Sequence, residues 1–140
     1  MIDLVVEQKK PADPSKGHVP AYEYRVTLHE SSERIGGIRL RVGDAPALLT
    51  AGNIGYEIDE LHRGHHYAAR SCLLLGQVAL AHGLDPVIIT CDPGNVASRR
   101  TCERIGATLR GVFDVPVDHE MYKKGARKVC RYEWSPNRAG

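Results

Sequence analysis

The stretch LHRGHHYAAR, residues 61–70, lies where the hydrophobic period of the chain changes. Before it, IGYEID (54–59) alternates apolar and polar residues with the period of two that is typical of a half-buried strand. After it, residues 67–82 carry apolar side chains at helical spacing, and Gly83 is a suitable helix stop. The next apolar run, VIITC (87–91), has the character of a strand buried on both faces. The order strand, helix, strand predicts a parallel pair of strands joined by a right-handed crossover.

The remaining segments predict further strands and one more helix. Polar residues 30–34 predict a turn, and residues 43–52 and 114–128 are expected to form loops. Asn95 is placed to cap a short helix that Gly106 ends. Further strands are predicted at residues 2–7, 22–29, 38–42, 109–115 and 129–134.

Together these elements predict an α/β fold of the α+β type, with a mixed and mostly antiparallel sheet around one parallel pair. In the helix that follows the quoted stretch, the positions expected to face the core are Ala69, Cys72, Leu73, Gly76 and Leu80.

Composition narrows the class of protein. The 140 residues suit a single domain with a core of its own, and 42% hydrophobic and 26% charged residues are ordinary for a globular chain. Nineteen basic and 17 acidic residues leave a net charge of only +2, which argues against a strong field for nucleic acid. No run approaches the ~18 apolar residues of a membrane span, and the start lacks a signal-peptide pattern. The four cysteines form no C-x-x-C pair, so we expect reduced, mostly buried thiols in a cytoplasmic protein.

The turn between the strand and the helix suits a phosphate or diphosphate. Free backbone N–H groups and the positive end of the helix dipole meet at a helix start. Gly64 allows a ligand to approach the backbone, Ala68 and Ala69 keep the first turn narrow, and Arg63 adds positive charge.

Two blocks of residues carry a resemblance to a known family. RGHHYA (63–68) resembles the acetyl-coenzyme A (acetyl-CoA) loop of the GNAT acyltransferases, whose pattern is Arg/Gln-x-x-Gly-x-Gly/Ala. NVASRRTCERIGA (95–107) resembles the family's Asn-x-x-Ala/Ser…Glu-x-x-Gly-Phe helix. The matches run from about residue 53 to 111 in the family's order. They look closest to the branch that includes ribosomal-protein N-terminal acetyltransferases.

The resemblance implies a GNAT fold in which strands 53–59 and 87–91 start parallel and splay apart, with the pantetheine arm in the opening. It implies one domain over residues 1–140, with N-terminal strands and the acceptor side in 1–50, the acetyl-CoA core in 51–111 and C-terminal strands in 112–140. The residues that it places at the coenzyme are Ile58, Asp59, Arg63, Gly64, His65, His66, Tyr67, Ala68, Ala69, Asn95 and Ser98.

The chain departs from the family pattern at three places. His66 replaces the usual loop glycine, so the backbone there must accept a side chain, and histidine tolerates a positive φ better than most residues. Cys102 stands where many members carry a tyrosine that protonates the leaving thiolate. The two N-terminal helices that usually cover the acceptor side are missing. The acceptor pocket would then be open, or it would be closed by loops 43–52 and 114–128 or by a second subunit in a homodimer.

Acetyl transfer to an amine needs a base, a donor to the oxyanion and an acid for the thiolate. The resemblance places the oxyanion donor among the backbone N–H groups of residues 55–59. Glu57 is the candidate base, acting through water, and the alternative is a solvated strand carboxylate. Cys102 is the candidate acid, and the alternative is a small core residue. Asp59 is expected to cap the following turn, whereas His119 and Tyr122 lie on a loop that could reach the acceptor.

Three other functions stay open at this stage. His62, His65 and His66 could bind a metal, but no matching Cys/His pair completes a tetrahedral site. Two clusters of arginine and lysine could bind nucleic acid, but no groove-reading motif accompanies them. A GNAT-like module could also bind acyl-CoA as a sensor without catalysis. We expect an N-acetyltransferase that uses acetyl-CoA and a primary amine on a small molecule or a protein N-terminus, without metal, nucleic acid or membrane.

Overall fold

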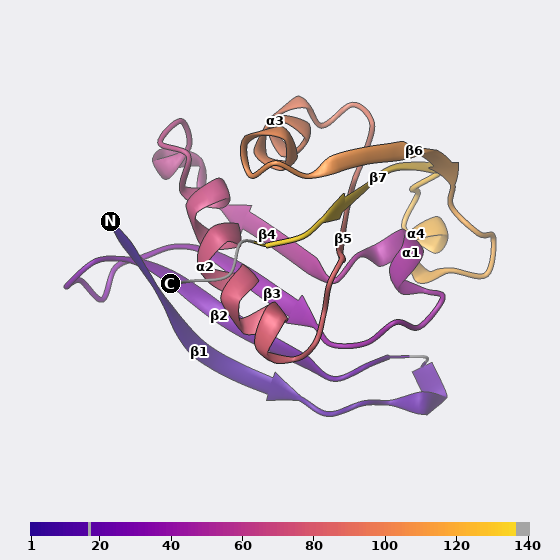
Figure 1. Cartoon of the computed structure of the whole chain (residues 1–140), viewed down its shortest axis with the longest axis horizontal. Coiled ribbons are helices and arrows are strands. Elements are labelled where there is room, and N and C mark those ends of the chain that lie inside the picture. Colours follow the sequence, from indigo (N-terminus) through magenta and orange to yellow (C-terminus); the bar gives the residue numbers. More distant parts are fainter. Residues whose placement is uncertain (17, 137–140) are drawn as a thin grey trace.

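In the computed structural model, which describes residues 1–16 and 18–136, the strands form a single sheet flanked by helices (Figure 1). The strands are β1 (Ile2–Lys10), β2 (Ala21–Leu28), β3 (Arg34–Arg41), β4 (Ile54–Ile58), β5 (Val87–Cys91), β6 (Thr108–Asp114) and β7 (Lys128–Trp134). The helices are α1 (Leu48–Ala51), α2 (Tyr67–Ala81), α3 (Val96–Arg104) and α4 (Glu120–Lys123), with 3-10 turns η1 (Pro14–Lys16) and η2 (Glu60–His62).

The strand order in the sheet is β1-β2-β3-β4-β5-β7-β6. Among the strand pairs of the described residues, only β4 and β5 run parallel, and the others are antiparallel. The predicted mixed sheet with one parallel central pair is therefore confirmed.

The parallel pair is joined only at its beginning. Its register contains the single partnership Ile54 with Ile89, after which the two strands part. Asn53, only 2% exposed, fastens this end: its backbone N–H donates to the Ile88 carbonyl at 2.7 Å, and its Oδ1 accepts the Ile88 N–H at 2.8 Å. Its Nδ2 also donates to the Arg41 carbonyl on β3. One buried asparagine thus holds three strands together where the gap between β4 and β5 starts.

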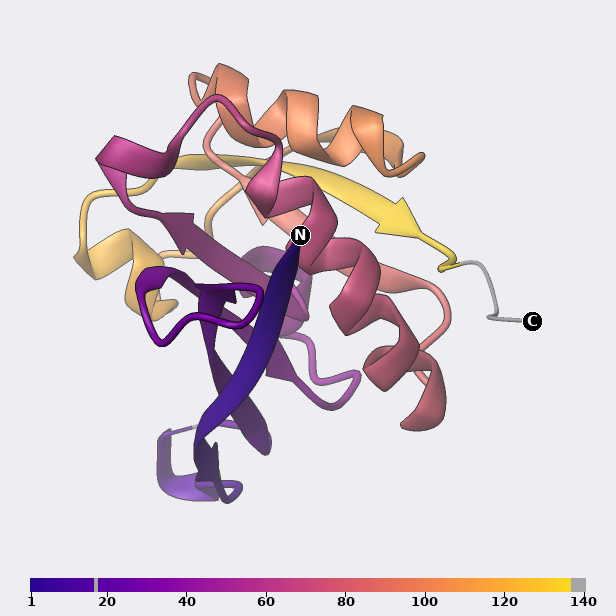
Figure 2. The ribbon, with the colours of Figure 1, turned by 90° about the vertical axis from the view of Figure 1, so that its left-hand side faces the viewer.

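Helix α2 packs against β1, β3, β4 and α3, and Figure 2 shows α2 and α3 beside one another. Ala69, Cys72 and Gly76 are buried as predicted, but Leu73 is 51% exposed whereas Leu75 is fully buried. Three consecutive leucines at 73–75 give no phase by themselves, so the packing partners decide which of them faces inward. The buried positions of α2 are Ala69, Ser71, Cys72, Leu75, Gly76 and Ala79.

Strand β3 begins at Arg34, four residues before the predicted start. The prediction missed Gly36 and Gly37 because glycine is a poor strand former. The structure requires glycine here: a Cβ on Gly36 would lie 2.3 Å from the Glu57 carbonyl oxygen of β4. The two strands therefore approach more closely than residues with a side chain would permit.

Helices α1 and α4 occupy the two segments that were predicted as loops. They lie next to each other at one end of the sheet (Figure 1), where His119 Nε2 is 3.2 Å from the Ala47 carbonyl oxygen. Arg131 Nε donates to the Leu49 carbonyl at 2.7 Å and ties α1 to β7. Both helices are only one turn long, which explains why no helical period was visible.

No helix in the described part of the chain is long and apolar enough to cross a membrane.

Candidate functional site

The turn before α2 carries a row of backbone N–H groups that make no hydrogen bond within the described part of the protein. Gly64 has φ +92° and His66, the N-cap residue, is in the left-handed region at φ 61°, ψ 25°. The structure gives the N–H groups of residues 64–69 no acceptor among the described residues, and side chains 63–66 are exposed. Unbonded N–H groups at the start of a 15-residue helix make this turn a candidate cradle for an anion. His66 therefore adopts the positive φ that histidine was expected to tolerate at this position.

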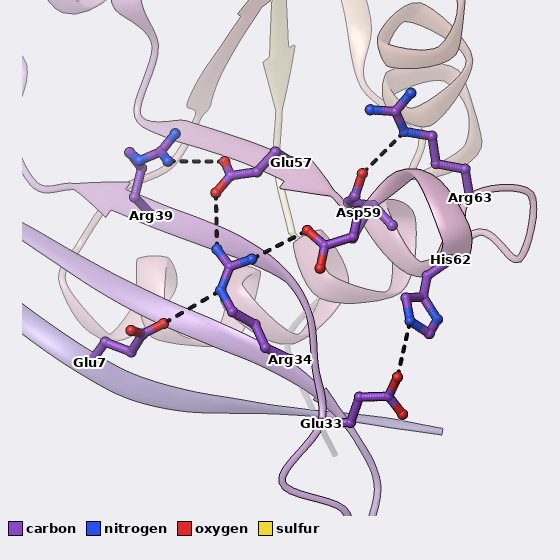
Figure 3. A network of polar contacts seen from close by, with 9 residues as sticks. Glu7, Glu33, Arg34, Arg39, Glu57, Asp59, His62 and Arg63 are labelled. Carbon is purple, nitrogen blue, oxygen red and sulfur yellow. Dashed lines mark hydrogen bonds and ion pairs between the residues drawn. The ribbon is translucent and has the colours of Figure 1, made fainter.

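The polar side chains around this turn contact other groups of the protein (Figure 3). Arg63 Nε donates to the Ile58 carbonyl at 3.1 Å, so the arginine folds back over the end of β4. His62 pairs with Glu33 at 3.3 Å, and the His65 ring lies 5.3 Å from the Tyr67 ring. Among the residues that the structure describes, no three His, Cys, Asp or Glu side chains gather at a possible metal site.

A cavity of about 290 Å³ opens in the gap between β4 and β5. Both predicted α3 residues line it: Asn95 is the N-cap of α3, and its Oδ1 accepts the Ser98 N–H at 3.1 Å. The short helices contribute Ala51 and Met121, so segments 43–52 and 114–128 both reach the cavity. The complete lining is Arg39, Arg41, Ala51, Ile54, Gly55, Tyr56, Thr90, Cys91, Asn95, Ser98 and Met121.

Tyr56 is one of the lining residues that sequence reasoning missed. It lies on β4, and its hydroxyl is 3.1 Å from Ser98 Oγ across the gap. Burial raises the pKa of Tyr56 above its usual value, so the phenol stays protonated at neutral pH. Its position in the alternating IGYEID stretch indicated only that it shares a face with Ile54. Nothing in the sequence pointed to its contact with Ser98.

The backbone of β4 also faces the gap. The Asp59 N–H donates to the Ile35 carbonyl of β3, which makes residues 35 and 59 a hydrogen-bonded pair. Hydrogen-bonded and non-bonded pairs alternate along an antiparallel ladder. The N–H groups of Tyr56 and Ile58 therefore point away from β3 and toward the gap. Beyond Ile54 the register gives β4 no partner on that side.

Glu57 points to the other face of the sheet, where it lies between two arginines (Figure 3). Its carboxylate is 3.0 Å from Arg39 Nη2 and 3.5 Å from Arg34 Nη2. These three residues line a second cavity of about 270 Å³ over β1–β4. Because Arg39 lines both cavities, the two lie next to each other.

Asp59 is the N-cap residue of the turn η2, as expected, but its side chain makes no cap hydrogen bond. The turn is closed by the Asp59 backbone carbonyl, which accepts the His62 N–H at 2.8 Å. The carboxylate instead lies 3.3 Å from Arg34 Nη1 (Figure 3). The nearby guanidinium competes for the carboxylate that would otherwise accept the N–H groups of the turn.

The cysteines differ in their access to the gap. Cys102 is fully buried in the core, and burial raises the pKa of its thiol to about 12. Cys91 lines the cavity, and burial raises the pKa of its thiol to about 11. Both are therefore protonated thiols at neutral pH. The proton-donor role of Cys102 stays a prediction. Three hydroxyl groups line the cavity, those of Tyr56, Thr90 and Ser98, and that of Thr90 donates to the Thr50 carbonyl.

The two loop residues considered for the acceptor side are held in local contacts. His119 Nδ1 accepts the Met121 N–H at 3.0 Å while its other ring nitrogen faces Ala47. The Tyr122 ring stacks under the Arg127 guanidinium, 3.7 Å away. Neither residue lines the cavity between β4 and β5, whereas Met121 between them does.

Comparison with solved structures finds acetyltransferases. An acetyltransferase from Agrobacterium tumefaciens is 27% identical, with a TM-score of 0.57, over 80% of this chain and 60% of that one. Two others share the fold at lower identity. The ribosomal-protein-S5-alanine acetyltransferase from Vibrio fischeri has a TM-score of 0.65 at 18% identity (84% and 62% covered). The microcin C7 self-immunity acetyltransferase MccE, in complex with acetyl-CoA and AMP, has a TM-score of 0.63 at 19% identity (82% and 61% covered).

The chain thus spans 60–62% of the length of these three proteins. The comparison with curated proteins gives no match. The family model described as the acetyltransferase (GNAT) domain matches residues 7–108, which include β2–β5, the helix-start cradle and Asn95 with Ser98. The resemblance seen in RGHHYA and NVASRRTCERIGA is therefore confirmed, and the chain belongs to the GNAT family of acetyltransferases.

Proposed function

We propose that this chain is an acetyl-CoA-dependent N-acetyltransferase that transfers the acetyl group directly to a primary amine, on a small molecule or a protein N-terminus. The observation that carries the proposal is the cavity in the β4–β5 gap. Side chains from both faces of the sheet line it, with Arg39 on one face and Tyr56 with Ser98 on the other. Two substrates can therefore meet in the gap from opposite faces, as direct transfer requires.

The coenzyme would be bound by the backbone at residues 63–69 and by α3. The N–H groups of 64–69 would donate to its diphosphate, as at other helix starts. Asn95 and Ser98 would line its pantetheine arm beside β4. Ile58 ends β4, and Arg63 donates back to its carbonyl. Together with Asp59 they would border the arm where it leaves the gap. When bound, acetyl-CoA supplies the activated acyl group as a thioester.

The protein would assist the transfer at three points. The inward N–H groups of Tyr56 and Ile58 would donate to the oxyanion. Glu57 would take the proton of the amine through water from the neighbouring cavity. The Tyr56–Ser98 hydroxyl pair, or Cys102, would protonate the leaving thiolate, which needs only modest help because a thiol has a pKa of about 8.5.

The test is acetylation of a broad amine panel, with free thiol release and N-acetyl product both measured by mass spectrometry. We expect turnover of at least one amine class at a rate well above hydrolysis of acetyl-CoA. Tight binding of acetyl-CoA without acetylation of any amine would contradict the proposal. That result would instead favour a sensor module that binds acyl-CoA.

A further inference from the structure

We propose, resting on the acetyltransferase function above, that Arg41 selects the acceptor. It does so by binding an anionic group, either a carboxylate or a phosphate, on the amine substrate. Arg41 ends β3, and its side chain lines the β4–β5 cavity on the same face as Arg39. Its Nη1 donates to the carbonyls of Ala51 and Gly52 at 3.3 and 3.2 Å. These bonds fix the guanidinium against the end of α1.

Arg41 lacks a carboxylate partner, whereas its neighbour has two. Arg39 pairs with Glu57 at 3.0 Å and with Glu23 at 4.0 Å. No such pair joins Arg41 to an acidic side chain of the described residues, and no Asp or Glu lines the cavity. The guanidinium is half-buried, and desolvation lowers the pKa of Arg41, as does the nearby Arg39. Glu23 and Glu120 act in the opposite direction and favour the charged form, but neither lines the cavity. An arginine stays charged in proteins, so the cavity holds a guanidinium that no carboxylate contacts.

The position of this charge excludes the coenzyme diphosphate as its partner. The cradle at residues 63–69 follows the carboxyl end of β4, whereas Arg41 lies beside Asn53 and Ile54 at the amino end. Arg41 also lies on the face away from the Tyr56–Ser98 pair. An anion that reaches Arg41 must enter with the acceptor. The Nε and Nη2 groups, which make no hydrogen bond to the described residues, are the donors available to it.

The substitution Arg41→Gln separates this role from a structural one. A glutamine amide keeps an N–H donor for the carbonyls of Ala51 and Gly52 but has no charge. The matched control is Arg110→Gln, because Arg110 lies on β6 in an exposed pair with Glu133. A fold defect in Arg41→Gln would lower activity on every acceptor alike, whereas a lost anion contact lowers activity on anionic acceptors alone.

The experiment measures kcat and KM on matched probes: ω-amino carboxylates of two to six carbons against their primary amides, the corresponding aminoalkylphosphonates, and amidated peptides that begin Ser-Asp or Ser-Asn. We expect an anionic probe to exceed its neutral match in kcat/KM by about 10- to 100-fold, the range for a charge-assisted hydrogen bond. Arg41→Gln should abolish this preference mainly through KM, and Arg110→Gln should keep it. The probe series with the highest kcat/KM shows whether the anionic group is a free carboxylate, a phosphate or an acidic peptide side chain.

Equal use of charged and neutral probes, or a preference that survives Arg41→Gln, would overturn the inference and leave the transferase function standing. Binding of acetyl-CoA with no acetylation of any probe or of the broad amine panel would overturn both. Calorimetry of acetyl-CoA binding to each variant distinguishes these outcomes from damage to the coenzyme site.

Discussion

Single residues decide both the shape of the gap and its chemistry. Asn53 starts the divergence of β4 and β5, His66 turns the backbone into α2, and Glu57 sits beside the cavity between two arginines. Sequence reasoning identified His66 and Glu57 because a motif and an alternating strand surrounded them. Asn53 and Tyr56 were not found, because their roles consist of contacts with residues 35 and 42 positions away.

Replacement of Asn53 tests whether its hydrogen bonds hold β3, β4 and β5 together where the gap begins. Asn53→Ala removes the acceptor of the Ile88 N–H and the donor to the Arg41 and Gly43 carbonyls. We expect the free energy of unfolding, measured in urea, to fall by roughly 2–4 kcal/mol because buried polar groups lose their partners. The control is Asn95→Ala, which removes one exposed N-cap bond and should cost about 1 kcal/mol. Equal losses would show that Asn53 does not fasten the strands.

The left-handed backbone at position 66 gives a second prediction. His66→Gly should leave the free energy of unfolding unchanged or raise it by up to about 1 kcal/mol, because glycine enters this region without strain. His65 is absent from the positive-φ residues, so His65→Gly should lower it by about 0.5 kcal/mol through the added freedom of the unfolded chain. Urea titration of both variants checks the difference in sign, and a loss in both would contradict the assigned conformation.

Glu57 gives a third prediction. Glu57→Gln should lower kcat by about 100-fold near neutral pH, the lower end for general base catalysis, while acetyl-CoA affinity changes little. Activity should recover at high pH, where the amine is already neutral. Glu23→Gln is the matched control, since Glu23 lines the same cavity and also faces Arg39. A wild-type rate at every pH would remove Glu57 as the base.

Helices and strands were predicted correctly from the sequence where the hydrophobic period is clear. The strand–helix–strand order of residues 54–91 was predicted because IGYEID and VIITC flank a long helical run. The one-turn helices α1 and α4 were not, since four residues show no period. The start of β3 was also missed, because Gly36 and Gly37 serve a close strand approach that depends on β4.

The β3–β4 approach can be tested directly. Gly36→Ala would place a methyl group 2.3 Å from the Glu57 carbonyl oxygen, so β3 must move away from β4. We expect the free energy of unfolding to fall by roughly 3 kcal/mol, at the upper end of overpacking effects. In the control Gly94→Ala, the new Cβ meets only the exposed Asp92 carboxylate at 3.2 Å, and the loss should be small. A minor loss at Gly36 would show that the sheet adapts at this point.

At the scale of the molecule, the sheet brings together segments that are distant in sequence. The gap between β4 and β5 receives Asn95 and Ser98 from α3, Arg41 from β3 and Met121 from α4. Asn95 and Ser98, which we assign to the coenzyme, were predicted to share a site because they lie within one contiguous motif. The acceptor half of this arrangement was not predictable, since Arg41, Ala51 and Met121 meet only through the order of the strands and belong to no motif.

The most direct test of the account is calorimetric titration of the metal-free protein with acetyl-CoA and with CoA, for the wild type and for Gly64→Asp. We predict micromolar binding by the wild type and none by Gly64→Asp, because an added carboxylate repels the diphosphate at the cradle. Gly64→Ala is the control: it imposes the same backbone strain at φ +92° without charge, and its Cβ meets nothing within 4 Å. Unchanged affinity in a folded Gly64→Asp protein would contradict the assignment of residues 63–69 to the coenzyme.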